Sequence, residues 1–285
     1  MYARLLAPLF VVLWSSGFVG AKLGLPYAEP LTFLCLRYVF VILIMGAAAL
    51  VARAPWPRGR ALAHVAVAGV LIQAVYLGGV FMAIRHGLPA AIVALIVGLQ
   101  PIITAVSAGW LLGERVTLRQ WLGLAAGFVG VAMVVTHSRD PGLSATWNMH
   151  ALWPAIAALA GITLGTLYQK RFCPKFDLRA GAVVQFSASL AVTAPIAMLV
   201  ETMQVAWTGT FVFALGWLVL MLSVGAISLL NLLIRRGSAV TVTSLFYLTP
   251  AMTALLAWLL FHEHMQAWAI AGMALAVFGV WLARR

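Results

Sequence analysis

Two apolar stretches, GLQPIITAVSAGWLLGE (98–114) and YLTPAMTALLAWLLFHE (247–263), repeat one pattern about half a chain apart. In each, a glutamate follows a proline by thirteen residues, and the two prolines are 149 positions apart. Prolines, glutamates and glycines are not apolar filler, so their recurrence in register indicates an internal duplication. The residues that align at this offset include Pro101 with Pro250, Thr104 with Thr253, Glu114 with Glu263, Gly123 with Gly272 and Gly130 with Gly279.

The composition excludes a water-soluble protein. Hydrophobic residues make up 64% of the 285 positions and charged residues 8%, whereas soluble domains carry about 25% charged residues. Lipid tolerates such a surface, so the sequence predicts a polytopic α-helical membrane protein. The net charge of +12 does not indicate nucleic-acid binding, because the basic residues lie between apolar blocks.

Apolar blocks of about 20 residues, the length that crosses the hydrocarbon of a bilayer, give ten candidate transmembrane helices. The connections between the blocks are short and leave no room for a separate soluble domain. The blocks cover residues 4–22, 30–52, 61–84, 88–112, 117–136, 149–169, 180–201, 211–234, 239–261 and 265–283.

The basic residues predict how these helices are oriented. If the N-terminus is cytosolic, fourteen of the 18 Lys and Arg fall in cytosolic segments, and only Lys22, Arg85 and Arg139 fall outside. Cytosolic segments of membrane proteins carry an excess of Lys and Arg. Both termini are therefore predicted to face the cytosol.

The duplicated unit contains five helices, with one copy in residues 1–140 and the other in residues 141–285. Because five is odd, the second copy enters the membrane in the opposite orientation. Glu114 and Glu263 should then end their helices on opposite sides. Inverted repeats of this kind are typical of transporters that expose a midplane site alternately to the two faces.

The sequence resembles the ten-helix, EamA-type branch of the drug/metabolite transporter superfamily over essentially the whole chain. The resemblance rests on LWSSGFVGAKLGL (13–25), PLTFLCLRY (30–38) and QPIITAVSAGWLLGERVTLRQWLGLAAGFVGVAMVV (100–135). It implies a bacterial cytoplasmic-membrane protein whose ten helices surround a central cavity, lined mainly by helices 1, 3, 4, 6, 8 and 9. It also implies export of small metabolites, in particular amino acids, including aromatic ones. These motifs are specific to the superfamily and not to a substrate.

Uncharged polar and aromatic residues on the inner helices are the candidates for lining that cavity. A site for a zwitterion with an apolar side chain needs a few donors and acceptors between aromatic walls. The alternative is that Ser and Thr bond their own helix, while Trp and Tyr anchor at the membrane interface. The candidate substrate-binding residues are Trp14, Ser16, Gln73, Tyr76, Gln100, Thr163, Asn231, Ser244 and Tyr247.

The two repeated prolines, Pro101 and Pro250, are expected inside helices, where each removes a hydrogen bond and permits a kink. Such kinks either act as hinges while two gates alternate or give the cavity a fixed shape, and the sequence leaves both open. The repeated glutamates lie at helix ends and are interpreted as structural. Thr117 and Gln120 have the spacing of a capping box at the start of the next helix.

The predicted helix interiors contain one basic residue, Arg37, and no acidic residue. Arg37 either contacts a substrate carboxylate, extends toward the outer surface or binds helix carbonyls. The lack of an interior carboxylate argues against a proton-coupled exporter of organic cations, which needs one for both proton and cation. It also favours a facilitative carrier. A multidrug exporter and a sugar-phosphate-type carrier remain the alternatives to amino-acid export.

No catalytic, cofactor or metal site is expected. His262 and His264 are two positions apart and lack the HExxH spacing of zinc enzymes. The sequence has neither a GxSxG nucleophile elbow nor a Walker loop. The protein is therefore predicted to be a carrier and not an enzyme, acting as a monomer in the bilayer on a small-molecule substrate.

Overall fold

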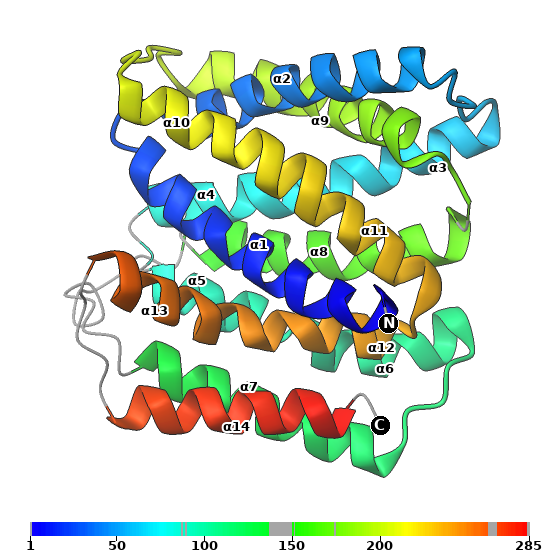
Figure 1. Ribbon diagram of the computed structural model, residues 1–285, viewed down its shortest axis with the longest axis vertical. Helices are drawn as coiled ribbons and strands as arrows, with labels where there is room; N and C mark the ends of the chain where they lie inside the picture. The colour runs from blue at the N-terminus through cyan, green and yellow to red at the C-terminus, as the bar shows by residue number, and fades with distance from the viewer. Residues whose placement is uncertain are drawn as a thin grey trace.

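In the computed structural model, the chain is a bundle of helices that run between two ends (Figure 1). The structure describes residues 2–86, 88, 90–136, 150, 152–173, 175–261 and 267–283. The secondary structure of these residues is helical apart from one antiparallel bridge between Ala28 and Val205. Arg139, Glu263 and the two histidines that flank Glu263 lie outside the described residues.

The helices follow one another with short connections. In chain order they are α1 (Tyr2–Gly24), α2 (Pro30–Val51), α3 (Arg60–Gly69), η1 (Val70–Leu77), α4 (Gly78–Arg85), α5 (Ala90–Val97), α6 (Gln100–Leu112), α7 (Leu118–Thr136), α8 (Leu152–Phe172), α9 (Leu178–Val200), α10 (Gly209–Trp217), η4 (Leu218–Ala226), α11 (Ile227–Arg236), α12 (Ala239–Thr243), η5 (Ser244–Tyr247), α13 (Leu248–Phe261) and α14 (Ala267–Ala283).

Seven helical stretches of the described chain are long and apolar enough to cross a membrane. Leu5–Gly17 and Ala267–Ala283 are shorter apolar helices. The predicted all-α class is confirmed, while the count of ten transmembrane helices stays a prediction. The seven stretches are Pro30–Val51, Arg60–Arg85, Ile92–Leu112, Leu118–Val135, Leu152–Phe172, Leu178–Val200 and Gly209–Arg236.

Two of the long stretches change from α-helix to π-helix in their middle. η1 joins α3 to α4, and η4 joins α10 to α11. π-Helical turns are rare and occur frequently at functional sites. No feature of composition separates these segments from the α-helix around them, so the sequence does not predict them.

The helix expected over residues 88–112 is broken. α5 ends at Val97 and α6 begins at Gln100, so Pro101 lies in the first turn of α6. A proline is tolerated there because its missing N–H would have no partner in the helix. Pro250 likewise lies in the first turn of α13, after the 3-10 turn η5. Both prolines thus lie just after an interruption of the α-helix, and their role as hinges or as fixed kinks stays a prediction.

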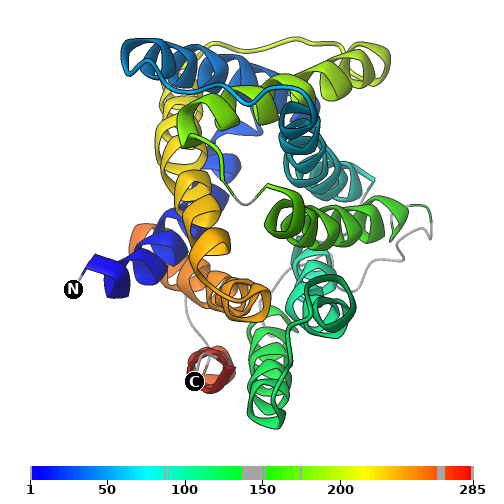
Figure 2. The ribbon, with the colours of Figure 1, turned by 90° about the vertical axis from the view of Figure 1, so that its right-hand side faces the viewer.

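The helices α7 and α14 pack backbone against backbone through glycines. A Cβ atom at Gly123 would lie 2.6 Å from the carbonyl oxygen of Gly279, and one at Gly130 would lie 2.6 Å from that of Gly272. These two contacts run in opposite directions along the chain, so the helices are antiparallel. Figure 2 shows the pair at one margin of the bundle, far from α2 and α9.

The start of α7 is fixed by the predicted capping box. The Thr117 N–H donates to Gln120 Oε1 at 3.0 Å, and the Gln120 N–H donates to Thr117 Oγ1 at 3.2 Å. This reciprocal pair supplies partners to two N–H groups that the helix leaves free. The expected capping box is confirmed.

Both chain termini lie at one end of the bundle, called here the terminal end (Figure 1). At the opposite end, Glu201 follows α9 and its carboxylate caps α2. It accepts hydrogen bonds from the Leu31 N–H at 2.9 Å and from the Thr32 N–H and hydroxyl, each at 2.7 Å. Arg85 at the end of α4 pairs with the same carboxylate at 3.1 Å. One side chain thus joins three helices.

Glu29 extends this network at the surface. It accepts hydrogen bonds from the hydroxyl and the N–H of Thr202 at 2.7 and 2.6 Å, and it pairs with Arg85 at 3.3 Å. The Thr202 hydroxyl is the main cause that lowers the pKa of Glu29 below its ordinary value. Both glutamates were predicted at helix boundaries, but the sequence did not reveal that the Glu201 side chain is fully buried.

The close approach of α7 and α14 predicts a strong effect of one methyl group. We expect Gly130→Ala to lower the thermal unfolding temperature in detergent, because the added Cβ would lie 2.5 Å from the Ala276 nitrogen. Overpacking of this kind destabilises by about 1–3 kcal/mol. Gly216→Ala is the control, since nothing lies within 4 Å of its Cβ position. Equal melting temperatures for the two variants would contradict the prediction.

Removing the charge of Glu201 should also destabilise the fold. Glu201→Gln leaves Arg85 with the more exposed Glu29 as its carboxylate partner and weakens the cap on α2. Breaking a fully buried ion pair costs about 3–5 kcal/mol, and because Arg85 is 35% exposed we expect about 2 kcal/mol. The unfolding free energy in denaturant measures this, with Glu29→Gln as a control that should lose less.

Candidate functional site

A chain of buried amide side chains crosses the bundle around α8. Gln185 of α9 donates from Nε2 to Gln169 Oε1 at 2.9 Å, and Gln169 donates from Nε2 to Asn231 Oδ1 of α11 at 2.8 Å. All three residues are at most 2% exposed. Uncharged amides are costly in an apolar interior unless they pair, so this amide chain ties α9, α8 and α11 together. Asn231 was a predicted site residue, whereas the two glutamines were not.

One turn away on α8, Thr166 meets Gln100 of α6. Gln100 Nε2 lies 3.5 Å from Thr166 Oγ1, at the outer limit of a hydrogen bond. The Thr166 hydroxyl donates to the carbonyl of Ile162 at 2.7 Å. Gln100 is therefore buried and weakly held.

Several buried polar atoms have no hydrogen-bond partner among the described residues. In folded proteins such atoms are few, and each calls for an explanation such as water or a ligand. Four of the predicted site residues are in this group. The atoms concerned in these four are both amide atoms of Gln73, Oε1 of Gln100, Oγ1 of Thr163 and the hydroxyl of Tyr247.

Trp14 and Ser16 of α1 lie in a separate, aromatic region. The Trp14 ring packs 5.3 Å from Phe10 and 5.1 Å from Phe246, in an edge-on contact with the latter. Ser16 accepts a hydrogen bond from the indole N–H of Trp217 at 3.1 Å. Trp14 is 6% exposed, so it is a buried wall between α1 and η5 and not an anchor at the bundle surface.

The structure places two candidates on η5 away from the amide chain. Tyr247 is 1% exposed, and its ring lies against Gly127 of α7, where a Cβ would approach it to 2.4 Å. The Ser244 hydroxyl donates to the Thr241 carbonyl at 2.9 Å, which is a bond within its own helical segment. This is the bond expected if Ser244 has a structural role, and its place in a substrate site stays a prediction.

Arg37 is buried within the bundle. It is 3% exposed, and its Nε donates to Ser223 Oγ of η4 at 2.6 Å. Arg37 therefore does not extend to the outer surface, and its Nε bonds a serine hydroxyl and not a helix carbonyl. Next to it in the chain, the Tyr38 hydroxyl donates to the Gln73 carbonyl of η1 at 2.9 Å, and Tyr76 on η1 is also buried.

At the terminal end, Glu114 and Lys170 form a latch across three helices. Lys170 Nζ lies 2.6 Å from Glu114 Oε1, and Glu114 accepts from the Ala239 N–H at 3.0 Å. Lys170 also donates to the Gly237 carbonyl. This Glu114–Lys170 latch joins the ends of α6 and α8 to the start of α12. It agrees with the structural role predicted for Glu114, although the sequence did not indicate the partners.

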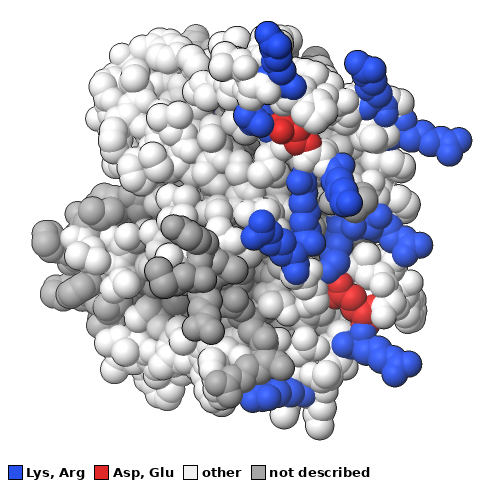
Figure 3. Space-filling view, turned by 45° about the vertical axis from the view of Figure 1, so that its right-hand side comes forward, with Lys and Arg blue, Asp and Glu red and all other residues white. Residues whose placement is uncertain are grey.

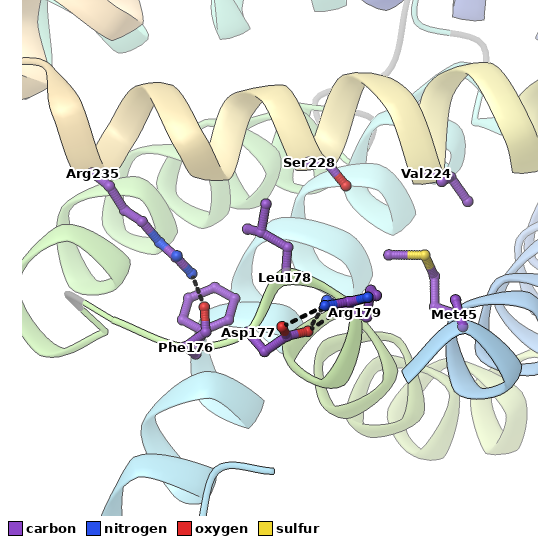
Figure 4. Close-up of a pocket in the computed structure, with 9 residues that line it drawn as sticks. Met45, Phe176, Asp177, Leu178, Arg179, Val224, Ser228 and Arg235 are labelled. Atoms are coloured by element: carbon purple, nitrogen blue, oxygen red, sulfur yellow. Dashed lines mark hydrogen bonds and ion pairs between the residues drawn. The ribbon is translucent and has the colours of Figure 1, made fainter. Parts of the chain in front are cut away.

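Lys and Arg side chains gather at the terminal end (Figure 3). A pocket of about 570 Å³ opens here between α2, the start of α9 and α11 (Figure 4). Arg235 lines the pocket, and its guanidinium carbon lies 4.1 Å from the Phe176 ring centre. Its Nη2 donates a hydrogen bond to the Phe176 carbonyl. Arg179 lines the pocket too and pairs with Asp177 at 3.1 Å. Hydrogen bonding from the Arg179 side chain is the main cause that lowers the pKa of Asp177.

The chain shows clear similarity to known transporters. The EamA-like transporter family matches residues 1–136 and 150–285. The uncharacterized inner membrane transporter YedA of Escherichia coli (strain K12) is 27% identical over 90% of this chain and 84% of its own length. The "Probable amino-acid metabolite efflux pump" of Escherichia coli (strain K12) is 32% identical over 47% of this chain and 42% of its own length.

A solved crystal structure has the same fold, with a TM-score of 0.82 and 20% identity. The match covers 99% of this chain and 96% of that one. The family match extends over nearly all of the sequence and agrees with a bundle of apolar helices that buries polar side chains. The chain belongs to the EamA-like transporter family and is a membrane transporter of the drug/metabolite type.

Proposed function

We propose that this protein exports small metabolites, in particular amino acids, by alternating access in a bacterial inner membrane. The observation that carries the proposal is the set of buried, uncharged polar groups around α8 and η1, several of which have no partner among the described residues. Such groups suit a zwitterion, which needs donors and acceptors in a largely apolar site. The name of one relative, an amino-acid metabolite efflux pump, supports the same class.

The distribution of acidic residues favours this over export of organic cations. Of the six acidic residues, Glu29, Glu114, Asp177 and Glu201 flank described helices, and Asp140 and Glu263 lie outside the described residues. A cation exporter coupled to protons needs a carboxylate within the membrane to hold both ions in turn. A facilitative carrier needs none, and we infer facilitative transport.

The proposal includes ten transmembrane helices in two inverted units, residues 1–140 and 141–285, with both termini in the cytosol. The antiparallel crossing of α7 and α14 supports it, because an offset of 149 residues converts the Gly123–Gly279 contact into the Gly272–Gly130 contact. The π-helices η1 and η4 also begin 148 residues apart. The Lys and Arg at the terminal end support a cytosolic position for that end.

Pro101 and Pro250 lie in the first turns of α6 and α13. There they would allow the membrane-spanning segments 88–112 and 239–261 to bend as the carrier changes state. The central cavity and its lining residues belong to the same proposal. Within it, Gln73, Tyr76, Gln100, Thr163 and Asn231 would contact substrate, while Trp14 would form an aromatic wall.

Transport of amino acids into proteoliposomes tests the function. We expect saturable uptake of labelled aromatic or aliphatic amino acids without a pH gradient. Gln100→Ala should reduce uptake about tenfold, as the loss of one or two buried hydrogen bonds does. Ser244→Ala is the control, because its hydroxyl bonds its own helical segment. Uptake that requires a pH gradient would contradict the facilitative mechanism, and no uptake of any amino acid would contradict the substrate class.

The Glu114–Lys170 latch should control access from the terminal end. We expect Glu114→Gln to favour the state open at that end by about fivefold, the effect of a partly exposed ion pair worth about 1 kcal/mol. The measurement is the rate at which a maleimide modifies Thr166→Cys, in a background without Cys35 and Cys173, from the cytosolic side of inside-out vesicles. Glu29→Gln, at the opposite end, is the control, and equal labelling rates would contradict a gating role.

A further inference from the structure

The contact between α2 and η4 buries the positive charge of Arg37, whose Nε donates a hydrogen bond to a neutral group. Arg37 is 3% exposed, and Ser223 Oγ accepts from its Nε. Among the described residues, no carboxylate lies within ion-pair distance of Arg37. A charge in a low-dielectric interior is strongly unfavourable without a counter-charge. This place in the fold therefore favours an anionic ligand.

The surroundings of Arg37 supply further polar groups. η1 is held against α2 by the hydrogen bond from Tyr38 to the Gln73 carbonyl. Gln73 itself is 1% exposed, and its side-chain amide keeps an unused donor and an unused acceptor among the described residues. The two segments that bond to α2 here through Ser223 and the Gln73 carbonyl are both π-helical, a geometry that recurs at functional sites.

The pocket at the terminal end lies along the same contact between α2 and η4–α11. Arg37, Val41 and Met45 are spaced by four residues and so share one face of α2, and Met45 lines the pocket. On the other side, Val224 lines the pocket and follows Ser223 directly.

The lining of this pocket carries two arginines and one acidic residue, Asp177, which pairs with Arg179. Arg179 and Arg235 both line it, and the Nε of Arg235 is buried without a partner among the described residues. An anion in this pocket would lie beside these two arginines, about two turns of α2 from Arg37.

We propose that Arg37, positioned by Ser223, binds the carboxylate of the transported substrate. The carrier then selects metabolites that bear a carboxylate and rejects the same molecules when that group is made neutral. A planar guanidinium binds a carboxylate through two parallel hydrogen bonds, which gives both affinity and orientation. This inference rests on the proposed function and specifies its substrate class.

The test compares amino acids with their carboxamides, which keep the shape and the amine and lose the negative charge. Four purified proteins are compared: the wild type, Arg37→Gln, Arg37→Lys and the exposed control Arg58→Gln. The melting temperature of each is measured with phenylalanine, leucine or their amides. Uptake of the two labelled amino acids is then measured in proteoliposomes. We expect the amino acids, and not the amides, to raise the melting temperature of the wild type and of Arg58→Gln.

For Arg37→Gln we expect uptake to fall about tenfold or more, as for loss of a charged hydrogen bond, and stabilisation by amino acids to disappear. Its melting temperature without ligand should be unchanged or higher, because a buried charge has been removed. Arg37→Lys should retain part of the uptake.

Two results would overturn the inference while the proposed function stands. One is wild-type protein that is stabilised equally by acids and amides. The other is Arg37→Gln that melts lower without ligand but transports as well as the wild type, which would make Arg37 a structural residue. A wild type that carries neither amino acid is a different outcome, because it removes the proposed amino-acid function itself.

Discussion

Polar groups inside this bundle have no bulk water to bind, and most of its particular contacts follow from that constraint. The amide chain of Gln185, Gln169 and Asn231 satisfies donors and acceptors from three helices with one another. Carboxylates lie outside the helices and bind their ends: Glu201 caps α2 and Glu114 caps α12. Each capping glutamate is far along the chain from the helix whose N–H groups it accepts. The same hydrogen bonds that give these N–H groups a partner therefore also hold distant segments together.

The buried polar groups that lack a partner or a counter-charge among the described residues are concentrated in a few places. Gln73 and Thr163 keep buried atoms without partners in the described chain, and Arg37 keeps a charge without a counter-charge there. Near Gln73 and Thr163, Gly161 and Gly165 of α8 bring the η1 backbone close. Close packing of this kind leaves little freedom for the polar groups to rearrange on their own. If these groups form the proposed substrate site, its geometry is set by the packing before a substrate binds.

Local rules predicted part of this from sequence. The capping box of Thr117 and Gln120 needs only a three-residue spacing, and it was found where expected. The apolar blocks predicted membrane-spanning helices because length and hydropathy suffice for that. The π-helices were missed, since a single apolar sequence fits α- and π-geometry equally well. The break before Gln100 lies next to Pro101, where the sequence predicted a kink. The partners of Arg37, Glu114 and Glu201 were missed because they lie 186, 125 and 170 residues away, and a single sequence carries no record of such contacts.

The cap on α2 also sets an order of events during biosynthesis. The N–H of Leu31 depends on a carboxylate that lies 170 residues later in the chain. At about 5–20 residues per second, the ribosome needs roughly 10–30 s to reach Glu201 after α2 has been made. During that interval the N–H groups of Leu31 and Thr32 lack their carboxylate partner, so the cap on α2 is completed only after α9 has been synthesised.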